Sequence, residues 1–284
     1  MILAGKHGMQ PWILGIFFNM GSTSFIEVNG QTLYYEIHGV GYPLVLIAGF
    51  NCNQSAWSLI LRELACHFKV VTFDNRDAGK SSCPDIQYTI EDMADDVADL
   101  IDALKLDKPH LLGHSMGGAI AQHVAYKYPN KLSRLILSST TAHFCTRSMY
   151  LQRFVESLME QGLPREMQIS CTLPWVYSNA LLANPKAVYQ VTQVLLNEPD
   201  IQSLPSFKRQ SKALEMFDSR SWINCIKHPT LVIYGTEDLL CLNDHVLLLK
   251  EIKSSKGFAF EETGHLPHIE QSKQFTLTVI NFLS

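Results

Sequence analysis

The sequence predicts an α/β fold in which a mostly parallel, eight-stranded sheet is covered by helices on both faces. Three observations lead to this class. Short apolar runs alternate along the chain with longer amphipathic segments, as in strand–helix units around a parallel sheet. Most of these runs lack polar–apolar alternation, which is typical of strands buried on both faces. The alternation stops near residue 141 and resumes near residue 222, which indicates an inserted segment.

The first two strands are predicted to form a hairpin. Phe25–Val28 and Leu33–His38 flank Asn29-Gly30, and Asn-Gly is the strongest short signal for a two-residue hairpin turn. The remaining strands are expected at 43–48, 68–74, 109–112, 132–138, 230–234 and 257–260.

Helices are predicted between the strands. Ser55 is expected to cap a helix from Trp57 to Cys66, and Thr89 with Asp92 resembles a capping box for the next one. That helix carries apolar residues at helical spacing. Its acidic residues, interpreted as a solvated face rather than a metal cluster, are Asp95, Asp96, Asp99 and Asp102. Further helices are expected over 118–125, 244–252 and 273–283.

Residues 141–221 are predicted to form a helical lid (cap) inserted into a core made of 22–140 and 222–284. Three helices are expected in the lid, over 149–161, 165–173 and 185–195. Prolines are expected to break them, at Pro164, Pro174, Pro185, Pro199 and Pro205.

Residues 1–21 are expected to be a disordered N-terminal extension, with translation starting at Met20 as one option. The apolar run Trp12–Phe18 follows Lys6 and is too short to span a bilayer as a helix. A secretory signal and an ordered docking arm remain alternatives.

The composition of the 284-residue chain argues against several function classes. The net charge is −4 and no basic stripe is present, so nucleic acid is not expected as a partner. Seven cysteines stand singly without C-x-x-C spacing, which favours neither zinc nor disulfides and suggests a cytoplasmic location. We expect no cofactor, no metal and no membrane span. The expected partner is a small-molecule substrate, and the oligomeric state is not indicated.

The chemistry is expected to centre on Gly113-His114-Ser115-Met116-Gly117, a G-x-S-x-G pattern. Between a buried strand and a helix, this pattern is typical of a nucleophile elbow, in which the glycines allow a tight turn. The serine hydroxyl is then exposed at the sheet's C-terminal edge, near a helix N-terminus that favours negative charge. Taken alone, the pattern also fits a glycine-rich turn with an incidental serine.

An acid and a base follow later strands in the expected positions. Sites in parallel sheets form beyond the carboxyl ends of the strands, where Asp238 and His265 are expected. The order Ser115, Asp238, His265 is the order that α/β-hydrolases use. His265 would accept the proton of the Ser115 hydroxyl, and Asp238 would orient the imidazole. Glu237 remains an alternative acid and His268 an alternative base, and His265 in a merely structural loop role is also open.

The oxyanion and substrate sites are expected in the neighbouring loops. The backbone N–H groups of Met116 and Phe50 are the candidate oxyanion donors. Gly49, Phe144 and Trp175 are candidate substrate-binding residues. An inward-pointing basic residue of the lid would favour a carboxylate-bearing substrate. The basic residues there are Arg147, Arg153, Arg165, Lys186, Lys208, Arg209, Lys212 and Arg220.

Together these motifs resemble the α/β-hydrolase superfamily, in the carboxylesterase and 3-oxoadipate enol-lactonase-like branch. The likeness runs from about residue 24 to 283 and is weakest in the lid. The matching stretches are 48–50 with Trp57, 74–81, 113–117, 235–238 and 264–270. The resemblance implies the α/β-hydrolase fold and a Ser-Asp-His carboxylic ester hydrolase.

Three positions depart from the family's pattern. Ala48-Gly49 stands where the family usually has His-Gly, so the oxyanion loop is expected to be held differently. Asp77 replaces the first glycine of D-x-R-G-x-G-x-S, where it is expected to pair with Arg76 or to line the pocket mouth. Leu242 stands where a proline is frequent.

The leading hypothesis is a serine hydrolase that cleaves a small carboxylic ester, lactone or thioester through an acyl-serine intermediate. One alternative is a hydrolase of carbon–carbon bonds in ring-fission products, with the same triad. Another is a small-molecule binding protein or receptor with slow or no turnover. Serine at 115 argues against dehalogenase and epoxide-opening relatives, which use an aspartate nucleophile, and Met116 argues against haloperoxidase-like relatives.

Overall fold

A computed structural model describes residues 21–241 and 244–284 of the chain. The predicted N-terminal extension, apart from Gly21, lies outside the described residues, as does Leu242. Among the helices of the described ranges, none combines the length and the apolar character that a bilayer crossing requires.

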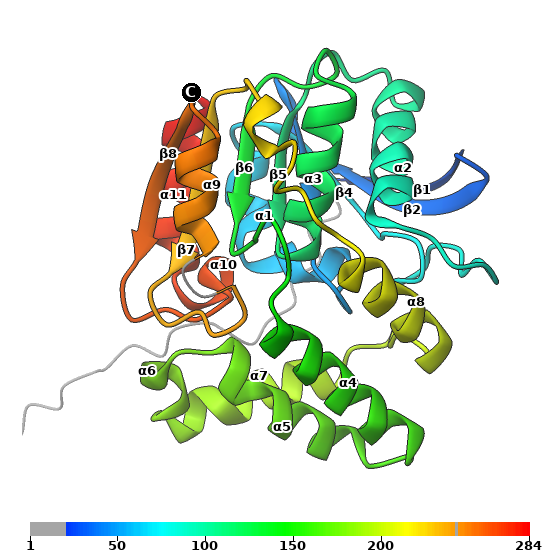
Figure 1. Ribbon diagram of the computed structural model, residues 1–284, viewed down its shortest axis with the longest axis vertical. Coiled ribbons are helices and arrows are strands. Elements are labelled where there is room, and N and C mark those ends of the chain that lie inside the picture. Colours follow the sequence, from blue (N-terminus) through cyan, green and yellow to red (C-terminus); the bar gives the residue numbers. More distant parts are fainter. Residues whose placement is uncertain (1–20, 242–243) are drawn as a thin grey trace, which may run out of the picture.

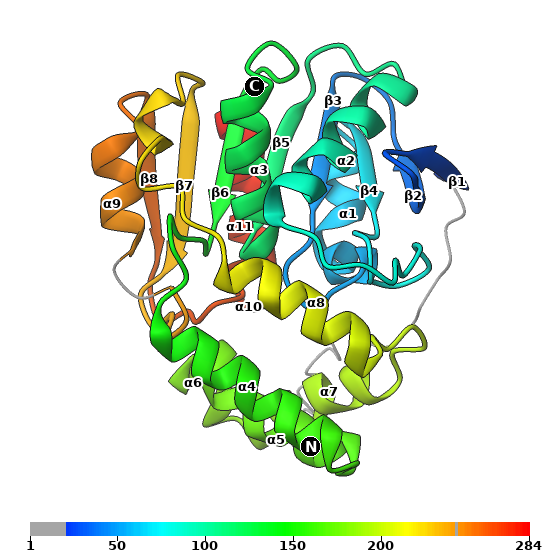
Figure 2. The same ribbon diagram turned by 45° about the vertical axis from the view of Figure 1, so that its right-hand side comes forward.

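The eight strands form one sheet in the order β1-β2-β4-β3-β5-β6-β7-β8 (Figures 1 and 2). The two pairings that involve β2 are antiparallel and the other pairings are parallel. The predicted eight-stranded, mostly parallel sheet is therefore confirmed. The strands are β1 (Gly21–Val28), β2 (Gln31–His38), β3 (Pro43–Ile47), β4 (Lys69–Phe73), β5 (His110–His114), β6 (Leu135–Ser138), β7 (Thr230–Gly235) and β8 (Ser255–Phe260).

The predicted hairpin is present, with Val28 opposite Gln31. Asn29 and Gly30 both have positive φ, 45° and 70°, as a two-residue turn of the I′ type requires. This turn fixes the register of the two strands.

Helices cover both faces of the sheet, as the apolar strands predicted. Adjacent residues of β3 enter different apolar layers: Val45 packs toward α2 and α3, and Leu46 packs toward α1 and α11. Because successive strand residues point to opposite faces, this division shows that both faces are buried. The covering helices are α1 (Ser58–Ala65), α2 (Ile90–Ala103), α3 (Met116–Lys127), α9 (Asp244–Glu251), α10 (Pro267–Glu270) and α11 (Ser272–Leu283).

Two helix starts test the capping expectations. The Thr89 hydroxyl accepts the Asp92 N–H and the Asp92 carboxylate accepts the Thr89 N–H, so the capping box is confirmed. The predicted Ser55 cap is wrong. A 3-10 turn (Gln54–Trp57) precedes α1, and its cap is Asn53, whose side chain accepts the Ser55 N–H.

The interpretation of Asp96 as a solvated residue is also wrong. Asp96 is only 2% exposed and accepts two hydrogen bonds from Arg76, at 2.7 and 2.6 Å. The loop after β4 lies against this part of α2, so one aspartate of the acidic face is enclosed by a guanidinium. The periodicity of α2 does not reveal this, because the partner lies twenty residues earlier in the chain.

Residues 141–221, predicted to form a lid and here called the lid segment, lie between β6 and β7 and are helical along most of their length. Figures 1 and 2 show α4 to α7 as an outer group beyond the carboxyl ends of the parallel strands, with α8 between this group and the core. Its helices are α4 (Thr146–Glu160), α5 (Arg165–Val176), α6 (Asn179–Leu182), α7 (Pro185–Leu196) and α8 (Leu204–Glu215).

The α8 helix was not expected, because Pro205 was interpreted as a helix break. Pro205 instead lies in the first turn, after the cap Ser203, where a missing N–H costs nothing. Pro185 similarly begins α7, whereas Pro174 lies in the last turn of α5.

An ion pair between a half-buried arginine and a buried aspartate attaches α8 to the core. Arg209 donates two hydrogen bonds to Asp77, at 2.8 and 2.7 Å, and the Tyr88 hydroxyl donates a third at 2.7 Å. Asp77 has a left-handed backbone, with φ 67°. The expectation that Asp77 pairs with Arg76 is therefore wrong, because Arg76 is already engaged by Asp96.

We expect Arg209→Met to destabilise the protein by about 3 kcal/mol, because it leaves the buried Asp77 carboxylate without its cation. Urea unfolding measures the change. The matched control is Arg220→Met, whose ion pair with Asp218 is exposed and should contribute less than about 1 kcal/mol. Equal effects of the two substitutions would contradict this account of the α8 contact.

Candidate active site

Ser115 occupies the single residue between β5 and α3. Its backbone has φ 53° and ψ −117°, a region that residues other than glycine rarely adopt. Close packing imposes this turn: a Cβ at Gly117 would lie 2.0 Å from the Ile47 carbonyl oxygen, and one at Gly113 would lie 2.2 Å from the Gly117 oxygen. The elbow pattern of the sequence thus corresponds to a strained strand-to-helix turn.

Asp238 and His265 form a buried pair beyond the ends of β7 and β8. His265 Nδ1 lies 2.9 Å from Asp238 Oδ2. The other carboxylate oxygen accepts the N–H groups of Leu240 and Cys241, at 2.8 and 3.0 Å. Burial disfavours the charged carboxylate, but the imidazole and the two backbone donors outweigh it and hold the pKa of Asp238 below its ordinary value. With Nδ1 engaged, Nε2 is the ring nitrogen left for proton transfer.

The His265 backbone is attached to the elbow and to the lid segment. Its carbonyl accepts the Nε2–H of His114 at 2.9 Å, and its N–H donates to the Val176 oxygen at 2.9 Å. The rings of His114 and His265 have centroids 4.9 Å apart. Because His114 directly precedes Ser115, this bond places the histidine loop beside the elbow.

The alternative acid and base are occupied elsewhere. Glu237 accepts the N–H of Asn179 at 2.7 Å rather than bonding to His265. His268 is buried against Trp57, with ring centroids 5.1 Å apart, behind His114. The geometry therefore favours Asp238 over Glu237 and His265 over His268.

The loop Ala48–Asn51, here called the oxyanion loop because Phe50 is a predicted oxyanion donor, passes directly beside Ser115. A Cβ on Gly49 would lie 3.3 Å from Ser115 Cβ and 3.1 Å from His114 Nδ1, so any larger residue here would crowd both side chains. Met116 is the first residue of α3, where the N–H groups have no acceptor within the helix. The two predicted oxyanion donors thus belong to segments that meet at Ser115.

Two unexpected side chains hold this loop. Asn75 Nδ2 donates to the Ala48 oxygen at 3.2 Å, and Gln210 Oε1 accepts the Asn51 N–H at 3.3 Å. Neither side chain was part of the sequence prediction, because Asn75 occupies a variable position of the 74–81 stretch and Gln210 belongs to no recognised motif. Ala48 is the one feature of the sequence that points to such contacts. Because its side chain is non-polar and cannot hold the loop, other residues have to do so.

An apolar cluster, here called the lid cluster, connects the lid segment with two of these loops. Its buried members are Leu151, Val155 and Phe207. Packed against them are Phe50 of the oxyanion loop, Leu240 of the Asp238 loop, Met159 and Trp175. Of the two predicted lid-derived substrate contacts, Trp175 belongs to this cluster. Phe144 is instead buried in the core, against Phe217.

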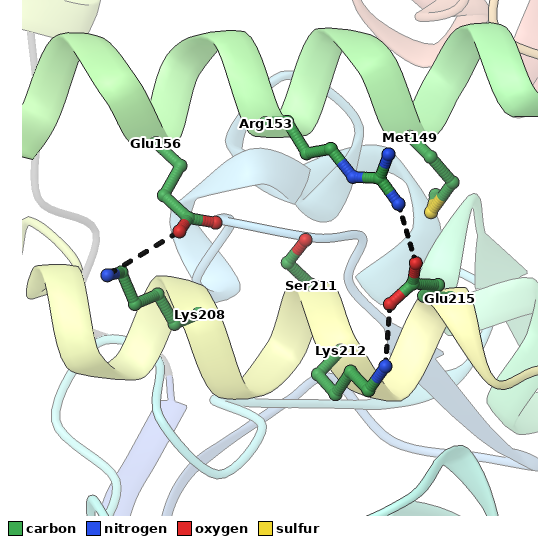
Figure 3. Close-up of a pocket in the computed structure, with 7 residues that line it drawn as sticks. All are labelled: Met149, Arg153, Glu156, Lys208, Ser211, Lys212 and Glu215. Carbon is green, nitrogen blue, oxygen red and sulfur yellow. Dashed lines mark hydrogen bonds and ion pairs between the residues drawn. The ribbon is translucent and has the colours of Figure 1, made fainter.

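The basic residues of the lid segment have other partners or are exposed. Figure 3 shows that Arg153 and Lys212 form ion pairs with Glu215, and that Lys208 forms one with Glu156. These residues line a cavity of about 220 Å³ between α4 and α8. Arg209 and Arg220 pair with Asp77 and Asp218, Arg165 donates to the Leu195 oxygen, and Arg147 and Lys186 are exposed.

One set of described residues has the spacing of metal ligands. Asp238, Cys241 and His265 each offer an atom within 4.8 Å of the others. Asp238 and His265 already share a hydrogen bond, and the Cys241 thiol donates to the Ser139 oxygen at 3.2 Å. The proximity is explained by this hydrogen bonding. All seven cysteines are free thiols.

We expect His114 to make stability depend on pH. Burial lowers its pKa from 6.5 to about 3, so between these values only the unfolded chain binds the extra proton. Stability is therefore lost as the pH falls through this window. Relative to His114→Gln, which keeps a donor but cannot ionise, the wild-type chain should lose about 2 kcal/mol of unfolding free energy between pH 7 and pH 5. Denaturant titrations at both pH values measure this, and a pH-independent difference would contradict it.

Comparison with known proteins places the chain among hydrolases. The family model for the alpha/beta hydrolase fold matches residues 42–272. RutD of Yersinia enterocolitica, provisionally named a carbamate hydrolase, is 28% identical over 264 residues, covering 88% of this chain and 92% of the relative. The 2-hydroxy-6-oxo-2,4-heptadienoate hydrolase of Pseudomonas putida is 27% identical over 256 residues, with 87% and 90% coverage.

A solved structure agrees with these sequence relatives. The enol-lactonase from Burkholderia xenovorans superposes with a TM-score of 0.79 at 26% identity, over 92% of this chain and 99% of that one. The expected resemblance is thereby confirmed, and the chain belongs to the α/β-hydrolase family.

Proposed function

We propose that this protein is a serine hydrolase that cleaves small, uncharged carboxylic esters, lactones or thioesters through an acyl-serine intermediate. The observation that carries the proposal is the buried Asp238–His265 pair, anchored through His114 to a strained elbow that bears Ser115. A hydroxyl nucleophile needs both an adjacent base and an acid that orients it.

The reaction proceeds in two halves. Ser115 Oγ attacks the carbonyl carbon while His265 Nε2 takes its proton, and Asp238 stabilises the imidazolium. The N–H groups of Phe50 and Met116 bind the oxyanion of the tetrahedral intermediate. Collapse of that intermediate releases the alcohol or thiol, protonated by His265. Water, deprotonated by His265, then attacks the acyl-serine, and Ser115 leaves with the proton.

The proposal of an uncharged substrate rests on the lid cluster. We place this cluster, with Phe50 and Leu240, along the substrate side of the site, and the lid segment as its cover. The lid's basic side chains pair with carboxylates, bond to a backbone oxygen or are exposed. Because a carboxylate without a cation is costly to desolvate, a dicarboxylic-acid enol-lactone is disfavoured.

A carbon–carbon bond hydrolase is the second candidate, favoured by the likeness to the Pseudomonas putida hydrolase. Its proposed machinery is the same, so the residues do not separate the two. Kinetics with vinylogous diketones beside simple esters would separate them, since a carbon–carbon hydrolase should prefer the diketones by kcat/KM.

We expect Ser115→Ala to lower kcat for p-nitrophenyl acetate by at least about 10³-fold in a folded protein, since no other group replaces the nucleophile. A fluorophosphonate probe should label the wild-type protein and not the variant. The matched control is Ser170→Ala on the surface of α5, which should change neither. Full activity of Ser115→Ala would reject the proposed nucleophile. A wild-type chain that is not labelled but binds small molecules tightly would favour a receptor.

We expect kcat/KM for mono-p-nitrophenyl succinate to be at least about 10-fold below that for p-nitrophenyl butyrate, because the free carboxylate would be desolvated without a cation. Methyl p-nitrophenyl succinate, of similar size but uncharged, should recover most of the loss. Equal or faster turnover of the carboxylate ester would mean that a cation does reach the pocket.

A further inference from the structure

A buried glutamine connects the lid segment to the oxyanion loop. Gln210 lies on α8 and its side chain is fully enclosed. Its Nε2 donates to the Arg76 carbonyl oxygen at 2.9 Å, and its Oε1 accepts the Asn51 N–H at 3.3 Å. Both ends of the amide are therefore in use, which is how a buried polar side chain is stabilised.

The position of these bonds along the backbone matters for the proposed oxyanion donor. The N–H of Phe50 belongs to the peptide between residues 49 and 50. The preceding peptide carries the Ala48 carbonyl, which Asn75 holds, and the following peptide carries the Asn51 N–H, which Gln210 holds. The donor peptide thus lies between two peptides that are each held by a side chain, so the chain is anchored at both of its ends.

The loop needs this restraint. Asn51 has a left-handed backbone, with φ 55°, which costs free energy for a residue other than glycine. Ala48 has no polar side chain, and Gly49 has none at all. On one side, therefore, the loop is held from the core by Asn75, and on the other side it is held from the lid segment by Gln210.

The far end of the Gln210 bridge rests on a rigid support. The Arg76 side chain is fixed by the buried Asp96 carboxylate, and the next residue, Asp77, is fixed by Arg209. Consecutive residues of α8 thus bind consecutive residues of the loop after β4. The position of α8 is thereby transmitted to the Asn51 peptide.

We propose that Gln210 is a positioning residue for the oxyanion hole, so that docking of the α8 helix sets the orientation of the Phe50 N–H. This inference rests on the proposed serine-hydrolase function and adds a dependence of that site on the lid segment. Gln210 acts only through the backbone of the oxyanion loop and does not touch the reacting atoms.

The test is Gln210→Met, which keeps the length of the side chain and removes both hydrogen bonds. We expect kcat for p-nitrophenyl butyrate to fall by about 10- to 100-fold with KM changed less than about 2-fold, because a displaced donor weakens binding of the transition state rather than of the substrate. Affinity for an alkyl trifluoromethyl ketone, whose adduct with serine carries an oxyanion, should fall by a similar factor. The pH profile of kcat/KM should be the same in the variant as in the wild-type protein, since His265 is not altered.

Gln152→Met is the matched control. Gln152 is also a buried glutamine of the lid segment, but it bonds to Ser211 and not to the oxyanion loop, so its kcat should stay within about 2-fold of wild type. The inference is overturned if Gln210→Met folds and keeps its kcat, or if Gln152→Met loses as much. Should Gln210→Met not fold, Gln210→Asn, which is one methylene too short, is judged by the same criteria. Turnover that persists in Ser115→Ala would instead reject the serine-hydrolase function itself.

Discussion

The backbone of Ser115 is held at φ 53° and ψ −117°, and this strained turn constrains much of the surrounding structure. Strain of this kind persists only where the neighbours determine the conformation fully. Here β5 is paired on both sides, with β3 and with β6, so its end cannot move. The two glycines of the motif allow α3 to start against the Ile47 carbonyl oxygen. The sheet register and the glycines together leave Ser115 no other conformation.

The same constraint explains why distant loops meet at one point. Parallel strands bring the ends of β3, β5, β7 and β8 to one edge of the sheet, where the oxyanion loop, the elbow, Asp238 and His265 follow. The His114 ring donates to the backbone of the His265 loop. A neutral imidazole is needed next to another histidine, and burial secures it by lowering the pKa of His114. A structural histidine thus supports the proposed base without competing for its proton.

The sequence was most informative where the signal is local. The Asn-Gly hairpin, the capping box at Thr89 and the uniformly apolar strands each predict a feature within a few residues, and the structure has all three. The loop positions of Asp238 and His265 followed from strand order and the rule for parallel sheets, and their catalytic roles remain predictions.

Two of the errors concern contacts between distant segments. The Asp77–Arg209 pair spans 132 residues, and no periodicity of either segment indicates it. The acidic helix face predicts a solvated Asp96, although a guanidinium from another loop encloses it. Proline at 205 predicts a helix break, whereas the first turn of a helix accepts proline. For the two ion pairs, tertiary packing decided an outcome that local preference leaves open, whereas Pro205 follows a local rule of helix starts. Two of these contacts, Asp77 with Arg209 and Asp96 with Arg76, support the segment that Gln210 bonds. A loop without a polar anchor at Ala48 must take its geometry from partners elsewhere in the chain. The oxyanion loop therefore depends on long-range contacts, which are the features that the sequence reveals least.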